Sequence, residues 1–560
     1  MPEKYLDSPH QLGEVTRNIG TVLLTNAHEF SKNHAFAERR NGQYKYWTWQ
    51  QLAADAYRVA NYYQTNGLVS GDKIGFVSAN GYWRFVCEIA CMSCGLVSVP
   101  IFPNYPDTII RDLLNFAEIK FLIVGSDQLA SKLKDGCWQK TLVIGDKDWQ
   151  LAEVSEAEQK NLQNKFAGIE STALAMIMFT SGTSGRPKGV MLSHHNILSQ
   201  QKALDLLWRP EKGMRFLCYL PWHHSFGGLF ERFSAFCSGG CLAIDDSWGK
   251  DINRLFMNYR EIKPHVYFGV PKVYQEIVAR VLSSRDLENC FFHTDLKFIF
   301  TAAAPLPLSA SDVFKAKGIP IVEGWGLTET SPCCTLTELN LDRKPGVVGW
   351  PIPGVQIRLD ASGEILVRGP NVMSGYYNSP KLTQEVLESN GWFHTGDLGE
   401  ITEDGVKILS RKDRMFKLSN GEKVFPGGIE ERIKTRCGFI KHAYVFGSGK
   451  TRASILIFPN YEMFCVKNDS DLTDSTCALP SSESLLCTCL GSCVSEINSS
   501  IKSDIERVDR IVIVPHELTI ENHELTPSFK LIPSVIEERY KEYMQDESPQ
   551  DALIFRLRAK

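Results

Sequence analysis

The sequence contains no long hydrophobic run, no excess of basic residues and no internal repeat. No part of its 560 residues reaches the roughly 18 consecutive apolar residues that a membrane-spanning helix needs. Lys and Arg total 61 against 65 for Asp and Glu. This net charge of −4 argues against nucleic acid as a partner, because a phosphate backbone favours a basic protein surface. These absences indicate a soluble globular protein.

The N-terminal segment MPEKYLDSPHQLGEV lacks the apolar core of a secretion signal, and we expect a cytoplasmic protein. No basic amphipathic helix, which would indicate binding to a membrane surface, stands out. The sequence does not decide whether the protein makes a peripheral contact with a membrane.

The sixteen cysteines are scattered along the chain, and we expect reduced thiols rather than disulfides. One group has helical spacing among apolar residues and predicts small buried side chains. A second group forms a C-x-C-x3-C pattern, which departs from the C-x2-C pairs of zinc sites and assigns no function. The first group is Cys87, Cys91 and Cys94, and the second is Cys487, Cys489 and Cys493.

The first third of the chain alternates short apolar strands with amphipathic helices. Thr48 opens one helix, with Gln51 at the capping-box position and Gly67 as its stop. Similar apolar strands are expected at 265–270, 296–300 and 319–325. This alternation predicts an α/β fold with a parallel sheet, and nucleotide chemistry should gather at the carboxyl ends of its strands.

Between residues 346 and 377 the pattern changes to Gly/Pro turns between short alternating runs, which predicts an antiparallel patch. The length predicts at least two domains. We expect a large N-terminal domain, residues 1–410, of doubly wound α/β subdomains with this β-rich patch. A small α+β C-terminal domain, residues 411–560, should follow it, with a surface insertion at 468–484.

Residues 180–189 read TSGTSGRPKG and follow the apolar run 173–179. Three glycines and four hydroxyls suit a loop whose N–H groups and hydroxyls wrap a polyphosphate. A Walker A loop is excluded, because Lys188 is followed by Gly189 rather than Ser or Thr. A generic flexible loop is the alternative. The run resembles the phosphate loop of the adenylate-forming superfamily, which includes acyl-CoA synthetases, adenylation domains of peptide synthetases and luciferases of the firefly type.

The resemblance spans roughly residues 30 to 545 and implies a role for each motif in turn. The segment PWHHSFG (221–227) places His224 beside the carboxylate of the acid and the α-phosphate. Glu231 and Arg232 follow four residues later than in the long-chain pattern Ala-His-x-x-Glu-Arg, so details of the acyl pocket are not transferred. The phosphate loop would wrap the β- and γ-phosphates with Thr180, Ser181, Gly182, Thr183, Ser184 and Gly185, and would use Lys188 as a mobile cation.

Two further segments, IFTAAAPLP and EGWGLTET, resemble the family's adenine-binding motifs. The resemblance puts Ala303 and Ala304 against the adenine and makes Trp325 its stacking face, with Gly326 beside it. Thr328 would touch the α-phosphate. Glu329 would coordinate Mg²⁺, a cation that prefers carboxylate oxygen, with Thr180 as a further ligand. Many relatives carry Gly where this chain has Ala302 and Ala303, which narrows the cleft.

The remaining motifs lie toward the C-terminus. In WFHTGDLG (392–399), Asp397 matches the family's ribose-binding carboxylate, and Arg411 matches the second ribose contact. Asp413 falls on the hinge about which a mobile C-terminal domain swings between adenylating and thioester-forming poses. Lys417 and Gly421 would face the main domain in the second pose. Lys530, in IENHELTPSFKL, would bridge the acyl carboxylate and the α-phosphate, although Ile-Pro replaces the usual Lys-Arg after Leu531.

Three features favour a fatty acid of medium to long chain: the LTPSFKL ending, the longer spacing in FKLSNGEKV, and the VIEERYKEY helix. The resemblance implies ATP, Mg²⁺ and coenzyme A as the small molecules required, with a CoA thioester as product. An acyl carrier protein is the alternative acceptor. A non-catalytic acyl- or nucleotide-binding protein on the same fold is an alternative of another class, and so is luciferase-like oxidation.

Overall fold

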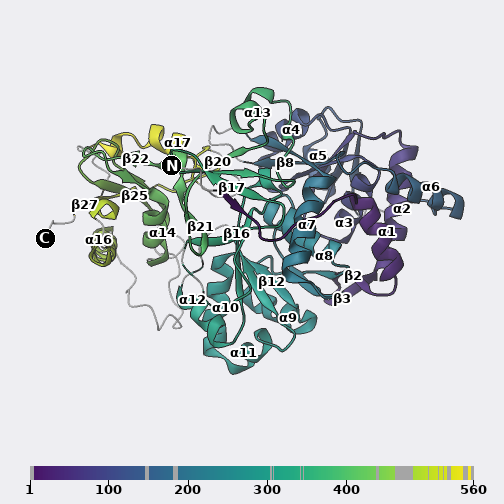
Figure 1. The fold of residues 1–560 in the computed structure, drawn as a ribbon, viewed down its shortest axis with the longest axis horizontal. Coiled ribbons are helices and arrows are strands. Elements are labelled where there is room, and N and C mark those ends of the chain that lie inside the picture. Colours follow the sequence, from purple (N-terminus) through teal and green to yellow (C-terminus); the bar gives the residue numbers. More distant parts are fainter. Residues whose placement is uncertain are drawn as a thin grey trace.

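The computed structural model describes most of the chain (Figure 1). The described residues are 5–144, 151–180, 187–302, 306, 308–340, 342, 344, 346–436, 440–460, 483–501, 504–514, 516–520, 522–525, 531–545 and 553–556.

The largest sheet has fourteen strands and joins a parallel half to an antiparallel half. In the parallel half, β10, β11, β12, β13, β14 and β2 run in the same direction, and β3 closes the edge. The predicted strands at 265–270, 296–300 and 319–325 are all present here. The bounds are β2 His34–Arg40, β3 Gln43–Thr48, β10 Arg215–Cys218, β11 Cys241–Ile244, β12 Val266–Gly269, β13 Phe298–Thr301 and β14 Ile321–Trp325.

The antiparallel half confirms the β-rich patch predicted from residue 346 onward. The ladder continues from β14 through antiparallel pairs to β1 at the far edge. Its strands are β15 Thr335–Leu336, β16 Val347–Pro351, β21 Gly405–Arg411, β20 Phe393–Thr402, β18 Glu364–Arg368, β17 Gln356–Leu359 and β1 Tyr5–Asp7.

A second sheet of seven strands has the order β19-β9-β8-β5-β4-β6-β7. Helix α3 (Tyr82–Ser93) contacts β4 and β5 of this sheet and β2 of the first, so it lies between the two sheets. Cys87, Cys91 and Cys94 are fully buried on and just after it, as predicted. The strands are β4 Lys73–Val77, β5 Val97–Ile101, β6 Phe121–Val124, β7 Lys140–Val143, β8 Leu174–Thr180, β9 Lys188–Ser193 and β19 Gly375–Tyr376.

Helices of the large domain pack around these two sheets. Helix α2 begins after Thr48, whose side chain and that of Gln51 form the predicted capping box. Helix α7 begins in the same way at Ser193 and Asn196. The bounds are α1 Ile19–Glu29, α2 Trp49–Thr65, α4 Asp107–Phe116, α5 Asp127–Lys132, α6 Glu156–Ala167, α7 His194–Trp208, α8 Arg232–Cys237, α9 Ile252–Ile262, α10 Pro271–Ser283, α11 Arg285–Phe291, α12 Leu308–Ala316 and α13 Pro380–Val386.

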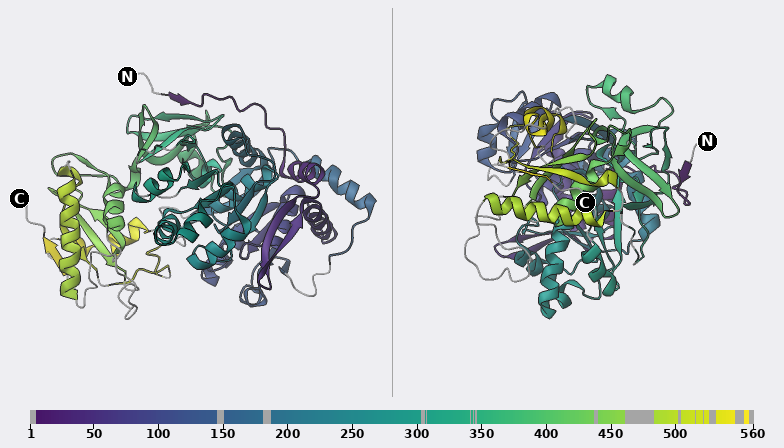
Figure 2. Two further views of the ribbon diagram at one scale, coloured as in Figure 1. Left: turned by 90° about the horizontal axis from the view of Figure 1, so that it is seen from below. Right: turned by 90° about the vertical axis from the view of Figure 1, so that its left-hand side faces the viewer.

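A smaller unit at one end of the long axis carries the C-terminal part of the chain (Figures 1 and 2). Its four-stranded sheet has a hydrophobic cluster on each face, and neither cluster contains a residue before Phe416. The chain therefore has two separate domains, each with its own core. The elements are β22 Phe416–Lys417, β23 Lys423–Val424, α14 Pro426–Arg436, β24 Ile440–Phe446, β25 Ala453–Pro459, α16 Glu483–Ser500, β26 Val508–Ile513, α17 Pro533–Arg539 and β27 Leu553–Arg556.

The predicted insertion at 468–484 lies outside the described residues except for its last two, which begin α16. Cys489 and Cys493 are half-buried on α16 against the C-terminal core, and the side chain of Cys487 lies outside the described part. None of the described helices is long and apolar enough to cross a bilayer.

Residues 8–18 form an extended arm that crosses the large domain from β1 to α1 (Figure 2). Two histidines at the start of α7 hold it. The N–H of Ile19 donates to Nδ1 of His194 at 3.2 Å, and Nδ1 of His195 lies 3.3 Å from the carbonyl of Val15.

Candidate active site

Four parallel strands end side by side at one edge of the large sheet. Because β10, β12, β13 and β14 run in the same direction, the loops that follow them lie together, as at the ligand-binding edge of open α/β sheets. These loops contain His224, Ala302 and the segment 325–329. The structure thus gathers at one edge three segments that lie far apart in the sequence.

Asp397 and Arg411 are ladder partners across the hairpin of β20 and β21. Nη1 of Arg411 donates to Oδ1 of Asp397 at 3.0 Å, and the indole N–H of Trp325 donates to Oδ2 at 2.9 Å. The carboxylate is 7% exposed, whereas the Trp325 ring is only half-buried. An aromatic face and an oriented carboxylate therefore lie together, which is the chemistry that grips a nucleoside.

Burial raises the pKa of the Asp397 carboxyl above its ordinary value, although Arg411 and Trp325 both lower it. Burial also lowers the pKa of Arg411, but the attraction of Asp397 and Asp413 outweighs it and the net shift is upward. Hydrogen bonds to the charged form lower a carboxyl pKa. A pair of ribose hydroxyls that donate to Asp397 would therefore stabilise its charged carboxylate further, in addition to the stabilisation by Arg411.

Glu329 lies at the same edge of the sheet, in the short 3-10 turn Thr328–Thr330 that follows β14. Its side chain is 8% exposed, and Oε1 accepts a 2.8 Å hydrogen bond from the hydroxyl of Tyr376. No hydrogen bond from the described residues reaches its second oxygen. A carboxylate fixed by one oxygen, with the other available, fits the preference of Mg²⁺ for carboxylate ligands and its habit of keeping water in its shell.

The hairpin of β8 and β9 comes to this carboxylate. Thr180 and Lys188 are paired at its tip, and Nζ of Lys188 lies 5.1 Å from the centre of the Tyr376 ring. Tyr376 itself belongs to β19, which pairs with β9. The ends of the predicted phosphate loop are therefore beside Glu329, while residues 181–186 between them lie outside the described part of the chain.

The loop that carries His224 meets the segment of Glu329. The hydroxyl of Thr328 lies 3.3 Å from that of Ser225, and the imidazole of His224 is exposed to solvent. A Cβ at position 326 would lie 1.9 Å from the carbonyl oxygen of Pro332, so only glycine fits there. Gly326 thus lets the backbone next to Trp325 pack directly against the backbone at Pro332.

The structure does not describe every predicted site residue. Ala303, Ala304 and Lys530 lie outside the described residues, as do Ser181, Gly182, Thr183, Ser184 and Gly185. Asp413 occupies a short 3-10 turn at 412–414, with Oδ1 3.8 Å from Nε of Arg411. Lys417 is exposed in β22, and Gly421 sits in the following turn with a φ of 85°.

Sequence reasoning missed several residues around the site. Tyr376 orients Glu329, and no local pattern marks it, because its contact depends on the pairing of β19 with β9. The ring of His223, beside the predicted His224, lies 4.3 Å from that of Phe102 between ring centres. Burial lowers the pKa of His223 to about 2, so it remains neutral. Asn80 ties the same loop down with hydrogen bonds to Leu220 and Trp222.

A buried ion network supports this loop from below. Arg84 and Glu88 of α3 pair at 2.7 Å, and Glu88 pairs with Arg232 of α8 at 2.8 Å, all three nearly inaccessible to solvent. Trp222 lies within 6 Å of both guanidinium groups. Arg232 thus serves as an anchor between the two sheets, although its spacing from His224 is unusual.

Asp360, Glu364 and His394 form the one group among the described residues whose spacing suits a metal. Nζ of Lys412 lies 2.7 Å from Glu364 and already supplies a positive charge. Through this ion pair the cluster connects Lys412, which precedes the predicted hinge residue Asp413, to the antiparallel half of the sheet.

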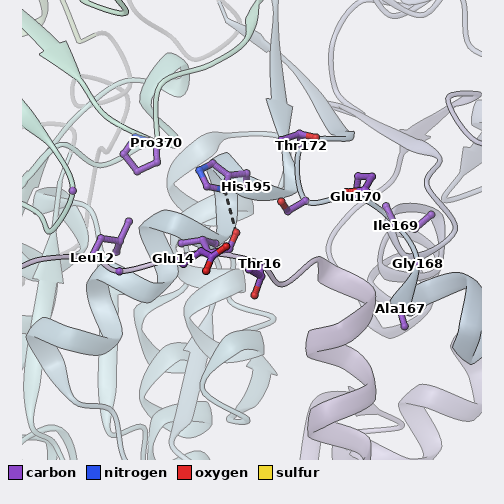
Figure 3. Close-up of a pocket in the computed structure, with 14 residues that line it drawn as sticks. Leu12, Glu14, Thr16, Ala167, Gly168, Ile169, Glu170, Thr172, His195 and Pro370 are labelled. Carbon is purple, nitrogen blue, oxygen red and sulfur yellow. Dashed lines mark hydrogen bonds between the residues drawn. The ribbon is translucent and has the colours of Figure 1, made fainter.

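Two cavities lie away from these residues. One of about 710 Å³ opens beneath the N-terminal arm, where His195 points toward the arm between Leu12 and Thr172 (Figure 3). The other, of about 630 Å³, lies at the opposite edge of the parallel strands, among Trp208, Phe216, Val266 and Phe298.

Comparisons with known proteins agree with this arrangement. Residues 23–377 match the family described as AMP-binding enzyme, and residues 413–546 match the AMP-binding enzyme C-terminal domain. Long chain acyl-CoA synthetase 2 of Arabidopsis thaliana is 27% identical, with 89% of this chain and 87% of that protein covered. Long-chain-fatty-acid–CoA ligase FadD15 of Mycobacterium bovis is 26% identical, with 85% and 87% covered. The structure of O-succinylbenzoate coenzyme A synthetase from Bacillus subtilis with AMP superposes with a TM-score of 0.72 at 19% identity, covering 93% of this chain and 98% of that one.

Proposed function

Because the chain belongs to the AMP-binding enzyme family, we propose that it is an AMP-forming fatty acid–CoA ligase that acts on medium- to long-chain acids. In the first half-reaction a carboxylate oxygen of the acid attacks the α-phosphorus of ATP, and pyrophosphate leaves. In the second, the CoA thiolate attacks the acyl carbonyl, and AMP leaves. The observation that carries the proposal is the joining of Trp325, Asp397 and Arg411 beside Glu329 at one edge of the sheet.

The nucleoside half of ATP is assigned to the first group of residues. The adenine stacks on Trp325, and the ribose hydroxyls donate to Asp397, which Arg411 holds in place. The β- and γ-phosphates extend toward the β8–β9 hairpin, whose N–H groups and Lys188 oppose their charge. With the nucleotide in this orientation, the α-phosphorus lies between Thr328 and His224. The contact between Thr328 and Ser225 keeps the loops that carry these two residues together.

Magnesium would be held by Glu329 and Thr180, and when bound it would neutralise charge on the phosphate oxygens. Tyr376 orients Glu329 for this role, because its hydroxyl fixes one carboxylate oxygen and leaves the other available to a metal ion.

Lys530 is the proposed cation between the acyl carboxylate and the α-phosphate. Its positive charge would stabilise negative charge that grows in the transition state, a contribution of about 3 to 5 kcal/mol to the barrier. We place the domain boundary at residues 410 and 411 and the hinge at Asp413. The C-terminal domain then brings Lys530 for the first half-reaction, and Lys417 and Gly421 for the second.

The decisive experiment is acid-dependent pyrophosphate release. Purified protein is incubated with ATP, Mg²⁺ and a panel of straight-chain acids, with and without CoA, and acyl-CoA is measured in parallel. We expect pyrophosphate with fatty acids and a thioester only when CoA is added. Absence of pyrophosphate with every acid would refute the ligase proposal.

The alternatives give different results in the same assay. Pyrophosphate without a CoA thioester, followed by thioester formation on a carrier protein, would indicate the carrier-protein acceptor. Nucleotide or acid binding without pyrophosphate would indicate a binding protein. The relatives' names favour neither alternative.

A Lys530→Ala variant separates the half-reactions. We expect it to lose adenylation and to keep most thioester formation from preformed acyl adenylate. Lys417→Ala is the matched control, because it should show the reverse pattern. Equal loss of both halves in Lys530→Ala would count against the domain swing.

A further inference from the structure

The catalytic edge of the sheet and the 630 Å³ cavity lie at opposite ends of the same strands. Phe216, Val266 and Phe298 line the cavity and are register partners in one row across β10, β12 and β13. Two residues further along, Phe268 and Phe300 form the next row on the same face. The catalytic loops begin two residues beyond that row, so about 13 Å separates them from the cavity.

Aromatic rings fill the space between the two. We define the aromatic partition as Trp208, Phe226, Phe230, Phe268 and Phe300. Phe230 lies 4.6 Å from Phe300, 5.6 Å from Phe268 and 5.7 Å from Trp208, measured between ring centres. All these phenylalanines are at least nine-tenths buried. Trp208 both belongs to the partition and lines the cavity.

The two ends of the partition face different environments. Phe226 is two residues from His224, and its N–H donates to Nδ1 of that histidine at 3.3 Å. Its ring contacts Phe300 at 5.6 Å. A tail leaving the carboxylate next to His224 therefore meets Phe226, then Phe230 and Phe300, before it reaches the cavity.

Phe226 and Phe230 differ from the other rings of the partition in the element that carries them. Phe268 and Phe300 are fixed in the sheet, whereas Phe226 and Phe230 belong to a π-helix, Phe226–Glu231. This element type is rare and is frequent at functional sites. A Cβ at Gly228 would lie 2.1 Å from the carbonyl oxygen of Trp222, so glycine lets the π-helix start against the loop of His224. Arg232 and Glu88 fix its other end.

From this geometry we propose that the cavity receives the distal end of a long acyl chain and that Phe230 determines which acids reach it. The inference rests on the proposed function and adds to it the residue that sets chain-length preference. An octanoyl chain is too short to span the distance to the cavity. A palmitoyl chain reaches it only when the Phe230 ring moves aside. Each methylene that becomes buried there should raise kcat/KM about fourfold, which corresponds to about 0.8 kcal/mol.

Three variants test this proposal in the pyrophosphate assay with octanoate and palmitate. Phe230→Ala opens the partition and should raise the palmitate-to-octanoate ratio of kcat/KM by about tenfold or more. Phe291→Ala is the matched control, because this buried ring stacks on Tyr259 on the opposite face of the sheet and should leave the ratio unchanged. Val266→Phe fills the cavity and should lower the rate with palmitate while preserving that with octanoate.

A binding measurement makes the outcome independent of catalysis. Parinarate, a fluorescent long-chain acid, should bind the wild-type protein and bind Val266→Phe at least about tenfold more weakly. If neither Phe230→Ala nor Val266→Phe changes the chain-length ratio, and Val266→Phe binds parinarate normally, the inference is wrong although the ligase assignment stands. If no acid releases pyrophosphate but Val266→Phe loses parinarate, the ligase assignment fails and the cavity remains an acyl site.

Discussion

Replacement of Asp397 by Asn tests the nucleoside site most directly. The carboxylate is almost fully buried and receives one hydrogen bond on each oxygen, from Trp325 and from Arg411. Asparagine keeps the shape of the side chain and removes the negative charge. Its amide nitrogen can no longer accept from a donor, so one of the two oxygen positions is lost as well.

The size of the effect follows from the hydrogen bonds involved. Hydrogen bonds to a charged group contribute about 1.5 to 3 kcal/mol each. The loss of charge weakens the contacts to both ribose hydroxyls, so we expect about 2 to 4 kcal/mol in total. This corresponds to a decrease in kcat/KM for ATP of about 30- to 1,000-fold. Asp404→Asn is the matched control, because Asp404 lies on the turn between the same two strands and pairs with Lys344 rather than with Trp325 or Arg411; it should change kcat/KM little.

A cycle with 2′,3′-dideoxy-ATP identifies the contact. In the wild-type enzyme, removal of both ribose hydroxyls should cost about as much as the Asp397→Asn substitution. In the variant, the same change in the nucleotide should cost little more, because the partner is already gone. Full additivity of the two losses would refute the ribose assignment, even if Asp397→Asn were inactive.

Three further substitutions test other parts of the structure. Tyr376→Phe removes the hydroxyl that fixes Glu329, and we expect a higher Mg²⁺ concentration for half-maximal pyrophosphate release; an unchanged Mg²⁺ titration would contradict the role given to Glu329. Glu88→Gln leaves Arg84 and Arg232 buried without their carboxylate partner. The free energy of unfolding, measured in urea, should fall by about 3 to 5 kcal/mol. A loss below about 1 kcal/mol would contradict the structural role given to this ion network. Burial lowers the pKa of His194 to about 4, so the unfolded chain takes up a proton below about pH 6.5 that the folded chain does not. Stability from this group is therefore complete above about pH 6.5, and about 3 kcal/mol is lost as the pH falls to 4. His194→Asn keeps an acceptor for the N–H of Ile19 and should flatten this part of the stability profile; an identical pH dependence in both proteins would contradict the burial argument.

Local sequence rules predicted the elements that depend on local interactions. The helix at Thr48 begins where its capping box requires, because Thr48 and Gln51 satisfy each other's backbone groups. The strands that end at Gly269, Thr301 and Trp325 are short apolar runs that any parallel sheet would bury. The assignment of Asp397 to a nucleoside site stays a prediction, and it rests on the resemblance, since a lone aspartate on a hairpin has no distinctive pattern.

Contacts between distant elements were beyond the reach of such rules. Trp325 and Asp397 are 72 residues apart, and their hydrogen bond depends on β14 and β20 sharing one sheet through four intervening antiparallel pairs. Tyr376 reaches Glu329 only because β19 pairs with β9 of the other sheet. The spacing of Glu231 and Arg232 looked anomalous in the sequence. In the structure a π-helix, Phe226–Glu231, lies between His224 and Arg232, and Arg232 pairs with Glu88.

The two halves that we propose for the site, one for the nucleotide and one for the acyl chain, are built from different interactions. The nucleotide half consists of directional contacts among Trp325, Asp397, Arg411, Glu329 and Tyr376, and the loss of any one leaves a polar group unsatisfied. The acyl half consists of aromatic packing, in which a change of ring size shifts volume rather than breaking a specific bond. Departures from the family pattern at Ala302 and in the π-helix fall in or beside the acyl half. Substitutions there should therefore alter which acid is chosen while leaving the adenylation chemistry in place.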